Sequence, residues 1–123
     1  MTKQRRVLIV EDEEPVRKII RESLTSVGIM VDEAENGQIA IEKARTAHPD
    51  VVILDYLMPK MHGIEFVQLL RQESWGKNVA VIVLTNLPDE PHLVEMEKQR
   101  TCRILSKAQA SMQDIIEAVK QSL

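Results

Sequence analysis

The stretch Val51-Val52-Ile53-Leu54-Asp55, followed at once by Tyr56-Leu57-Met58-Pro59, decides the fold of this chain of 123 residues. Four apolar, β-favouring residues in a row predict a strand buried on both faces, as in the middle of a parallel sheet. The strand ends on a carboxylate, and Pro59 prevents it from continuing. Ligands of open α/β sheets bind outside the carboxyl ends of the strands. Asp55 therefore lies where we expect the chemistry of this protein.

Two strands are predicted before this stretch and two after it, each separated from the next by a helical segment. The strand at residues 29–34 is less apolar than the others, which places it nearer an edge of the sheet. The predicted strands cover residues 7–10, 29–34, 51–55, 79–84 and 101–105.

Five helices are predicted from apolar residues at helical spacing. Pro15 suits the first turn of the first helix, and Gly28 is expected to end it. The second helix closes before His48-Pro49, because a residue that precedes proline is pushed out of the α region. The fourth, at residues 93–99, is expected to be short and weak. The apolar residues behind these predictions are Val16, Ile19, Ile20, Leu24 and Val27 in the first helix, Ile39, Ala40, Ile41 and Ala44 in the second, Ile64, Phe66, Val67, Leu69 and Leu70 in the third, and Met112, Ile115, Ile116 and Val119 in the last, at 111–122, for which Ser111 is the expected N-cap.

The alternation of strands and helices predicts a parallel sheet with right-handed crossovers and helices on both faces. Five strands fit the flavodoxin-like order 2-1-3-4-5 better than a six-stranded dinucleotide fold. Neither GxGxxG nor GxxxxGK[ST] follows any strand, which argues against nucleotide binding. We therefore predict one doubly wound α/β domain over residues 1–123.

Composition narrows the kind of protein. The chain has 44% hydrophobic and 28% charged residues, as an ordinary soluble domain does. A formal net charge of −3 gives no general attraction to nucleic acid or to anionic membranes. Cys102 is the single cysteine, so no internal disulfide forms, and we expect it to be a buried apolar residue. No apolar run reaches the ~20 residues of a membrane span and no signal peptide follows Met1, so we expect a cytoplasmic protein.

Five side chains are expected to meet at the carboxyl edge of the sheet. In the order 2-1-3-4-5 the first and third strands are neighbours, so Glu11, Asp12 and Asp55 form one acidic cluster. Close carboxylates need either a raised pKa or a cation, and a set of oxygen ligands favours Mg²⁺. The fourth strand adds the hydroxyl of Thr85, and the fifth adds the ammonium of Lys107. This set suits a phosphoryl group, since an ionised Asp can attack phosphorus in line while the other groups bind the transferred oxygens.

Each of these residues also has a simpler structural interpretation. Asp55 can be a cap or loop residue, Thr85 can serve local hydrogen bonding, and Lys107 can be a surface lysine. The acidic run at residues 11–14 can be a solvated helix start that is favourable to the helix dipole. What favours a shared site is that all of them follow the carboxyl ends of strands in one sheet.

Four segments carry a family resemblance, namely residues 7–13 (VLIVEDE), residues 55–63 (DYLMPKMHG), residues 83–85 (VLT) and Lys107. With them the chain resembles, over essentially its whole length, the receiver domain of bacterial two-component response regulators, in the manner of the chemotaxis regulators. The spacing from Thr85 to Lys107 fits this family too.

The resemblance implies a phosphoacceptor and a metal site. A phosphoryl group would pass from the phosphohistidine of a histidine kinase to Asp55. Mg²⁺ would be held by Asp12, Asp55 and the backbone carbonyl of Leu57, with Glu11 acting through water. The remaining implied roles belong to Thr85 and Lys107, which would contact the phosphoryl oxygens, and to Met58, Pro59 and Gly63, which would shape the loop beside the site.

The departures from the family are concentrated on the output side. The family usually has Tyr or Phe three residues before the lysine, where the rotamer reports phosphorylation, but this chain has Ile104. The lysine is usually followed by a proline in a cis bond, but here by Ala108. A cis bond to alanine would cost ~2.5–4 kcal/mol, so we predict a trans Lys107–Ala108 bond and an altered loop.

Other departures lie close to the same face. Asn86 stands where a very small residue is usual, and its amide could narrow access to the phosphoryl group or hydrogen-bond to it. Gln99-Arg100 replaces the usual Gly-Ala, and Pro88 and Pro91 are expected to disturb the start of the fourth helix. We hypothesise that the face formed by the fourth helix, the fifth strand and the last helix is specialised or weakly coupled to Asp55.

Three functions compete. A phosphorylated receiver would have self-phosphorylation and autodephosphorylation chemistry only, and would not be an enzyme with a turned-over substrate. A haloacid-dehalogenase-type enzyme would need a second Asp two residues after Asp55, where this chain has Leu57. A phosphorylation-independent adaptor with a modified output face stays open because the aromatic residue and the proline are missing, although the acidic cluster, Thr85 and Lys107 argue against it. We predict the first function.

The expected partners follow from that function. They are a sensor histidine kinase or a histidine phosphotransfer protein, and a downstream protein target or, in a longer protein, a C-terminal output domain. We expect no direct binding of nucleic acid or membrane, and either a monomer or a phosphorylation-linked dimer. The sequence is compatible with a stand-alone receiver and with one cut from a longer protein.

Overall fold

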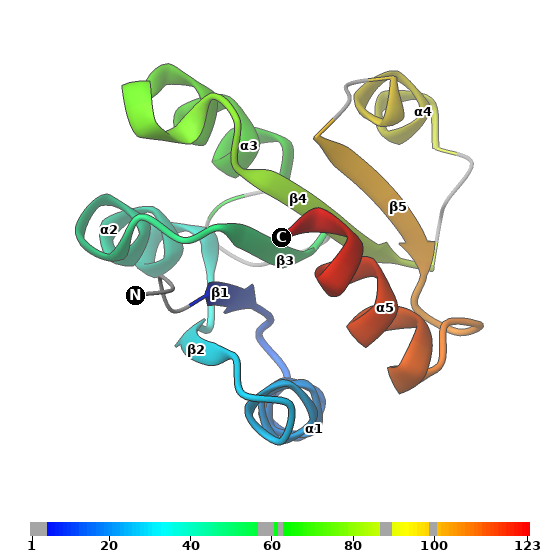
Figure 1. Cartoon of the computed structure of the whole chain (residues 1–123). Helices are drawn as coiled ribbons and strands as arrows, with labels where there is room; N and C mark the ends of the chain where they lie inside the picture. The colour runs from blue at the N-terminus through cyan, green and yellow to red at the C-terminus, as the bar shows by residue number, and fades with distance from the viewer. Residues whose placement is uncertain (1–4, 57–60, 62, 87–89, 99–100) are drawn as a thin grey trace.

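The buried run at Val51 forms β3 (Val51–Asp55), the central strand of a five-stranded sheet in the computed structural model (Figure 1). The strand order is β2-β1-β3-β4-β5 and every neighbouring pair is parallel, which confirms the predicted order and fold class. The other strands are β1 (Arg6–Val10), β2 (Met30–Ala34), β4 (Ala80–Thr85) and β5 (Cys102–Ser106). The structure describes residues 5–56, 61, 63–86, 90–98 and 101–123, so the predictions on Leu57, Met58, Pro59, Pro88, Gln99 and Arg100 lie outside the described residues.

The register of the sheet brings the carboxyl ends of its central strands level. Val10 pairs with Leu54, and Asp55 pairs with Leu84 one step further on. Thr85 pairs with Ser106, and its carbonyl accepts a hydrogen bond from the backbone N–H of Lys107 at 2.8 Å. The residues that follow β1, end β3 and β4, and follow β5 therefore share one edge.

Alternate residues of the strands enter two separate cores, because successive side chains point to opposite faces of a sheet. On one face α2 (Gly37–Ala47), α3 (Gly63–Gln72) and α4 (Pro91–Glu97) cover the sheet, and on the other α1 (Glu14–Thr25) and α5 (Met112–Ser122) do (Figure 1). The first core contains Leu8, Val52, Leu54, Val81 and Val83 from the strands, and the second contains Val7, Ile9, Val51, Ile53 and Ile82.

Helix α1 buries Ile20 and Leu24 but leaves Ile19 54% exposed. Ile19 and Ile20 point about 100° apart on a helix of 3.6 residues per turn, so only one of them faces the sheet. Val27 follows the helix and is 44% exposed. Two of the apolar residues at helical spacing, Ile19 and Val27, are therefore not part of the buried face.

The end of α1 also differs from the prediction. The helix ends at Thr25, with Ser26 as its C-cap, whereas Gly28 was expected to end it. Gly28 adopts φ 85°, a left-handed conformation that glycine enters without a Cβ penalty, and its N–H donates to the Thr25 carbonyl. The glycine thus closes the turn after the helix.

Helix α4 begins two residues earlier than predicted. Pro91 occupies its first turn, where the missing N–H has no intrahelical partner to lose, so the prediction that Pro91 disturbs the helix start was wrong. The Glu90 side chain caps the helix by accepting hydrogen bonds from the backbone N–H groups of His92 and Leu93.

The last helix, α5, begins as predicted. The Ser111 hydroxyl accepts from the Asp114 N–H at 3.1 Å, and the Asp114 carboxylate accepts from the Ser111 N–H at 2.9 Å. This capping box satisfies two backbone donors that a helix leaves unpaired. None of the helices in the described part of the chain has the length and apolarity that crossing a bilayer requires.

Candidate functional site

Three carboxylates converge at the carboxyl edge of the sheet. One carboxylate oxygen from each of Glu11, Asp12 and Asp55 lies within 4.8 Å of the other two. Glu11 and Asp55 are buried, while Asp12 is exposed to solvent. The set contains only oxygen donors, so it fits a hard divalent cation such as Mg²⁺ better than a softer metal.

Lys107 bridges two of these carboxylates from the end of β5. Its Nζ lies 3.0 Å from Oε1 of Glu11 and 3.2 Å from Oδ2 of Asp55, and 3.7 Å from Oε1 of Glu13. Burial lowers the pKa of Lys107, but its ion pairs with Glu11 and Asp55 outweigh this and hold the pKa above its ordinary value. The lysine is therefore a fixed positive charge within the acidic cluster.

Glu11 is an acid of the cluster with a shifted pKa. Burial, followed by hydrogen bonding with Asp55, raises its pKa to about 7, although Lys107 opposes the shift. A second negative charge beside Asp55 is thus disfavoured at neutral pH, and a bound cation would favour the ionised form of Glu11. The site has the electrostatic character of a cation-binding site.

Thr85 and Asn86 complete the rim. A pocket of about 210 Å³ is lined by both residues together with Asp12, Asp55 and Lys107. Thr85 is buried, and Asn86 is an exposed residue of the pocket lining; its effect on access to the phosphoryl group stays a prediction. The structure therefore brings together Glu11, Asp12, Asp55, Thr85 and Lys107, and Leu57 is the site residue that lies outside the described part of the chain.

The departures on the output side are visible in the structure. The Lys107–Ala108 peptide bond is trans, as predicted. Ile104 is partly buried and packs against the core that α2, α3 and α4 cover. Cys102 is a buried free thiol, also as predicted.

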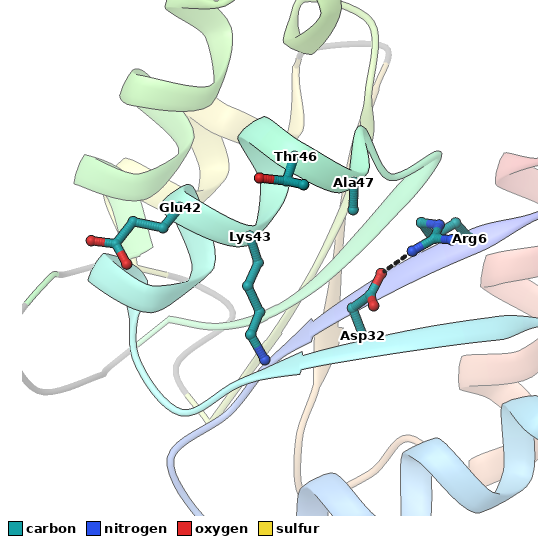
Figure 2. Close-up of a pocket in the computed structure, with 6 residues that line it drawn as sticks. All are labelled: Arg6, Asp32, Glu42, Lys43, Thr46 and Ala47. Atoms are coloured by element: carbon teal, nitrogen blue, oxygen red, sulfur yellow. Dashed lines mark hydrogen bonds and ion pairs between the residues drawn. The ribbon is translucent and has the colours of Figure 1, made fainter.

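A larger pocket, of about 640 Å³, lies away from these residues, between the start of β1, the middle of β2 and α2 (Figure 2). Arg6 and Asp32 in its wall form an ion pair of 2.9 Å. The charges of this pocket are thus partly matched within the chain, and it contains none of the predicted site residues, which are gathered at the other ends of the strands.

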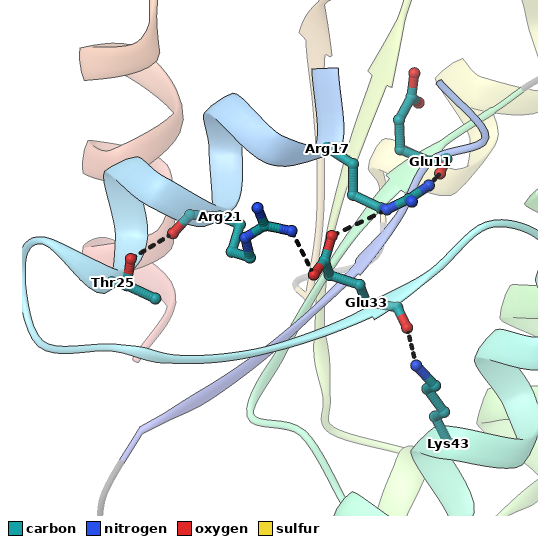
Figure 3. Close-up of polar contacts among 6 residues, drawn as sticks. All are labelled: Glu11, Arg17, Arg21, Thr25, Glu33 and Lys43. Carbon is teal, nitrogen blue, oxygen red and sulfur yellow. Dashed lines mark hydrogen bonds and ion pairs between the residues drawn. The ribbon is translucent and has the colours of Figure 1, made fainter. Parts of the chain in front are cut away.

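Two contacts of the site were not anticipated from the sequence. The Tyr56 hydroxyl, next to the phosphoacceptor candidate, donates to Oε2 of Glu90 at 3.0 Å and so reaches the cap of α4. Arg17 in α1 donates to the backbone carbonyl of Glu11 at 2.8 Å (Figure 3). The sequence shows a tyrosine beside Asp55 and an arginine one turn into α1, but it does not identify the groups to which these two side chains are hydrogen-bonded.

Fold and site together define a class. The protein is a doubly wound α/β domain whose acidic site, with one hydroxyl and one ammonium, lies at the carboxyl edge of its parallel sheet. This is the position at which open α/β sheets bind their ligands.

Known proteins identify the family within this class. The family model of the response regulator receiver domain matches residues 7–120. The phosphate regulon transcriptional regulatory protein PhoB of Escherichia coli is 35% identical over 86 residues, which are 70% of this chain and 38% of PhoB. The KDP operon transcriptional regulatory protein KdpE of Escherichia coli is 45% identical over 84 residues, which are 68% of this chain and 36% of KdpE. The chain belongs to the response regulator receiver family.

Solved structures agree with this assignment. The chemotaxis protein CheY4 of Vibrio cholerae superposes with a TM-score of 0.88 at 29% sequence identity, covering 98% of this chain and 100% of CheY4. A receiver domain of a Francisella response regulator gives a TM-score of 0.85 at 26% identity, covering 97% of this chain and 96% of the other. The matches to PhoB and KdpE, in contrast, span less than two fifths of those proteins.

Proposed function

We propose that this receiver domain accepts a phosphoryl group on Asp55 from the phosphohistidine of a sensor histidine kinase or a histidine phosphotransfer protein, and signals through phosphorylation-dependent protein contacts. The observation that carries the proposal is the position of the Asp55 carboxylate. It ends the central strand, lies 3.2 Å from the Lys107 ammonium and opens into the pocket that Thr85 also lines.

The chemistry is a transfer between two nucleophiles. An oxygen of the ionised Asp55 attacks the phosphorus in line, the P–N bond to the histidine breaks, and its electron pair returns to the imidazole nitrogen. The product is an acyl phosphate on Asp55. Water later attacks the same phosphorus and restores the carboxylate, so phosphoryl acceptance and its hydrolysis are the whole chemistry that we propose.

The groups around Asp55 have separate roles. Lys107, which is 3.2 Å from Asp55, would offset the charge of the transferred oxygens, and Thr85, which lines the same pocket, would contact them. Glu11, Asp12 and Asp55 would hold Mg²⁺, as their converging oxygens allow. When bound, Mg²⁺ offsets the repulsion between the aspartate and the incoming phosphoryl anion.

The surface beside the site supports docking of a phosphoryl donor. An apolar pocket of about 140 Å³ lies between α1 and α5, and Lys107, Ile19 and Met112 line it. Ile19 is 54% exposed there. Apolar side chains grouped in one surface pocket beside a charged site favour a protein contact, so we propose this pocket as part of the donor's docking surface.

The remaining partners are part of the same proposal. The downstream contact is a protein target or, in a longer protein, a C-terminal output domain, and the receiver acts as a monomer or a phosphorylation-linked dimer. The net charge of −3 supports a domain that does not itself bind DNA. We also propose a cytoplasmic location, with which the unpaired thiol of Cys102 is compatible.

The test is the intact mass of the protein after incubation with MgCl₂ and acetyl phosphate. We expect a gain of one phosphoryl group in the wild type and none in Asp55→Asn, which keeps the size of the side chain but removes the nucleophile.

An adaptor that works without phosphorylation is the second candidate, and Ile104 and the trans bond to Ala108 favour it. A wild type that gains no mass and also fails to bind beryllofluoride would decide for the adaptor.

A further inference from the structure

Arg17 reaches the acidic site from α1 without entering it (Figure 3). Its NH1 group donates to the backbone carbonyl of Glu11 at 2.8 Å, and its Nε donates to Oε1 of Glu33 at 3.0 Å. The side chain is only 15% exposed. Because the guanidinium is planar and its donors are fixed in a fork, the two bonds together set its orientation.

Glu33, the anchor of this arginine, is itself held by its neighbours on both sides of β2. Arg21 NH1 lies 2.7 Å from Oε2 of Glu33, and Lys43 of α2 donates to the Glu33 carbonyl (Figure 3). Burial opposes the ionisation of Glu33, but hydrogen bonds from Arg21 and Arg17 outweigh it and lower the pKa of Glu33. The carboxylate therefore stays charged at neutral pH and keeps Arg17 in place.

Both peptide groups that flank Glu11 are thereby fixed. The Glu11 N–H donates to the Ala34 carbonyl at 3.0 Å, and the Glu11 carbonyl accepts from Arg17. The second of these peptide groups leads directly into Asp12, whose carboxylate meets those of Glu11 and Asp55. The orientation of that peptide sets the direction in which the Asp12 side chain leaves the backbone, so its rotation would move the Asp12 carboxylate.

We propose that Arg17 is a positioning residue, which holds the Glu11–Asp12 peptide so that Glu11, Asp12 and Asp55 converge on one divalent cation. This inference rests on the proposed function, because the binding of Mg²⁺ at this site is part of that proposal. Groups that orient metal ligands from outside the coordination sphere typically contribute 10–100-fold to affinity.

The charge of Arg17 predicts the opposite effect from its hydrogen bond. A positive side chain near a cation site repels the cation, so removal of the charge alone would strengthen Mg²⁺ binding. Removal of the hydrogen bond would weaken it. Arg21 offers a matched control, because it shares the Glu33 carboxylate with Arg17 but is not bonded to Glu11.

The experiment measures Mg²⁺ affinity by MgCl₂ titration, followed through the backbone amide NMR shifts of residues 11–13. We expect Arg17→Gln to weaken the affinity about tenfold. Arg21→Gln should leave the affinity within about twofold or strengthen it, since it removes a charge while Arg17 keeps its own bonds to Glu33 and to the Glu11 carbonyl. Arg17→Lys should also weaken Mg²⁺ binding, because a single ammonium does not reproduce the two fixed donors of the guanidinium. Since lysine can keep the ion pair with Glu33, this variant replaces Arg17→Gln if the glutamine variant does not fold.

A second readout separates positioning from damage to the fold. The rate of phosphoryl gain from acetyl phosphate by Arg17→Gln should recover toward the wild-type rate as MgCl₂ is raised, because lost affinity is overcome by concentration. Equal affinities of Arg17→Gln and Arg21→Gln, or tighter binding by Arg17→Gln, would overturn the role of Arg17 and leave the proposed function standing. A wild type that binds no Mg²⁺ would overturn both.

Discussion

Single side chains at the carboxyl edge of the sheet differ in how far water reaches them, and this difference divides their roles. Glu11 and Thr85 are 3% and 2% exposed, whereas Asp12 is open to solvent. A buried carboxylate loses hydration and shifts its pKa, as Glu11 does. The exposed carboxylate of Asp12 can be reached by a cation from solution. Access to Asp55 is therefore from the side of Asp12 and Asn86.

Burial also makes a prediction for a residue outside the site. Cys102 is 3% exposed, and burial raises the pKa of its thiol to about 11 from an ordinary value of 9.0. The folded protein holds the thiol proton more tightly than the unfolded chain does. The protonated thiol therefore contributes to stability below the unfolded-state pKa, and this contribution is lost as the pH rises from 9 toward 11. We expect the free energy of unfolding of the wild type to fall over this range by about 2 kcal/mol more than that of Cys102→Ala.

The measurement is urea unfolding of both proteins at several pH values. Tyr56, whose pKa burial raises to about 12, titrates in both proteins, so the difference between the two curves isolates Cys102. The loss of the sulfur shifts the alanine variant by a constant amount at all pH values. Parallel curves from pH 8 to 11 would contradict the prediction.

The residues of the site were predictable to the extent that the strands position them. Asp55, Thr85 and Lys107 end or follow strands, and a parallel sheet aligns these ends without help from any side chain. Arg17 and Tyr56 were not predictable in the same way, because each acts through a long side chain whose partner depends on how α1 and α4 pack.

At the scale of elements, a buried strand is easier to recognise than the buried side of a helix. The run at residues 51–55 is apolar on both faces, so no choice of face arises. In α1 the pattern offered Ile19 and Ile20 equally, and only the position of the sheet selects Ile20. The start of α4 was missed because Pro91 was taken as a disruption when it is a first-turn residue.

Helix α4 is short, and its start depends on one carboxylate. Glu90 caps the helix and also accepts the hydrogen bond of the buried Tyr56 hydroxyl. We expect Tyr56→Phe to loosen the first turn of α4, since the capping carboxylate loses the partner that orients it. The expected result is amide hydrogen exchange at Leu93 and Val94 that is about tenfold faster than in the wild type.

The control for this prediction lies in the same molecule. Helix α5 has its own capping box at Ser111 and Asp114, so its amide exchange should not change in Tyr56→Phe. Glu90→Gln keeps an oxygen that accepts the tyrosine hydrogen bond, and it should retain most of the protection. Faster exchange throughout the molecule would indicate lost global stability and not a loosened helix start.

At the scale of the whole molecule, phosphorylation of Asp55 would have to change the face formed by α4, β5 and α5 through contacts that connect the two. The residue on β5 that is usually aromatic is Ile104, which is partly buried against the core. A branched aliphatic side chain packed in this way has no large alternative rotamer to report the state of the site. The structure also connects Asp55, through its neighbour Tyr56, to Glu90 and α4.

These two observations predict an uneven response to phosphorylation. With beryllofluoride and Mg²⁺ as the phosphoryl mimic, we expect backbone NMR shifts around Asp55, Thr85 and Lys107, and at the first turn of α4. The backbone NMR signals of residues 102–105 of β5 and of the body of α5 should shift little, because the packed Ile104 side chain transmits little of the structural change at Asp55. Large shifts over β5 and α5 would contradict weak coupling of this face.

A substitution makes the argument testable in the opposite direction. Ile104→Tyr places an aromatic side chain at the position that Ile104 now fills, and it should enlarge the shifts of β5 and α5 on addition of beryllofluoride. Tyr56→Phe should reduce the shifts at the first turn of α4 and leave those around Asp55 in place, since only the hydroxyl that reaches Glu90 is removed. If both variants respond as the wild type does, neither residue 104 nor the Tyr56–Glu90 contact carries the signal, and coupling must pass through the backbone at the end of β4 and β5, where Lys107 is bonded to Thr85.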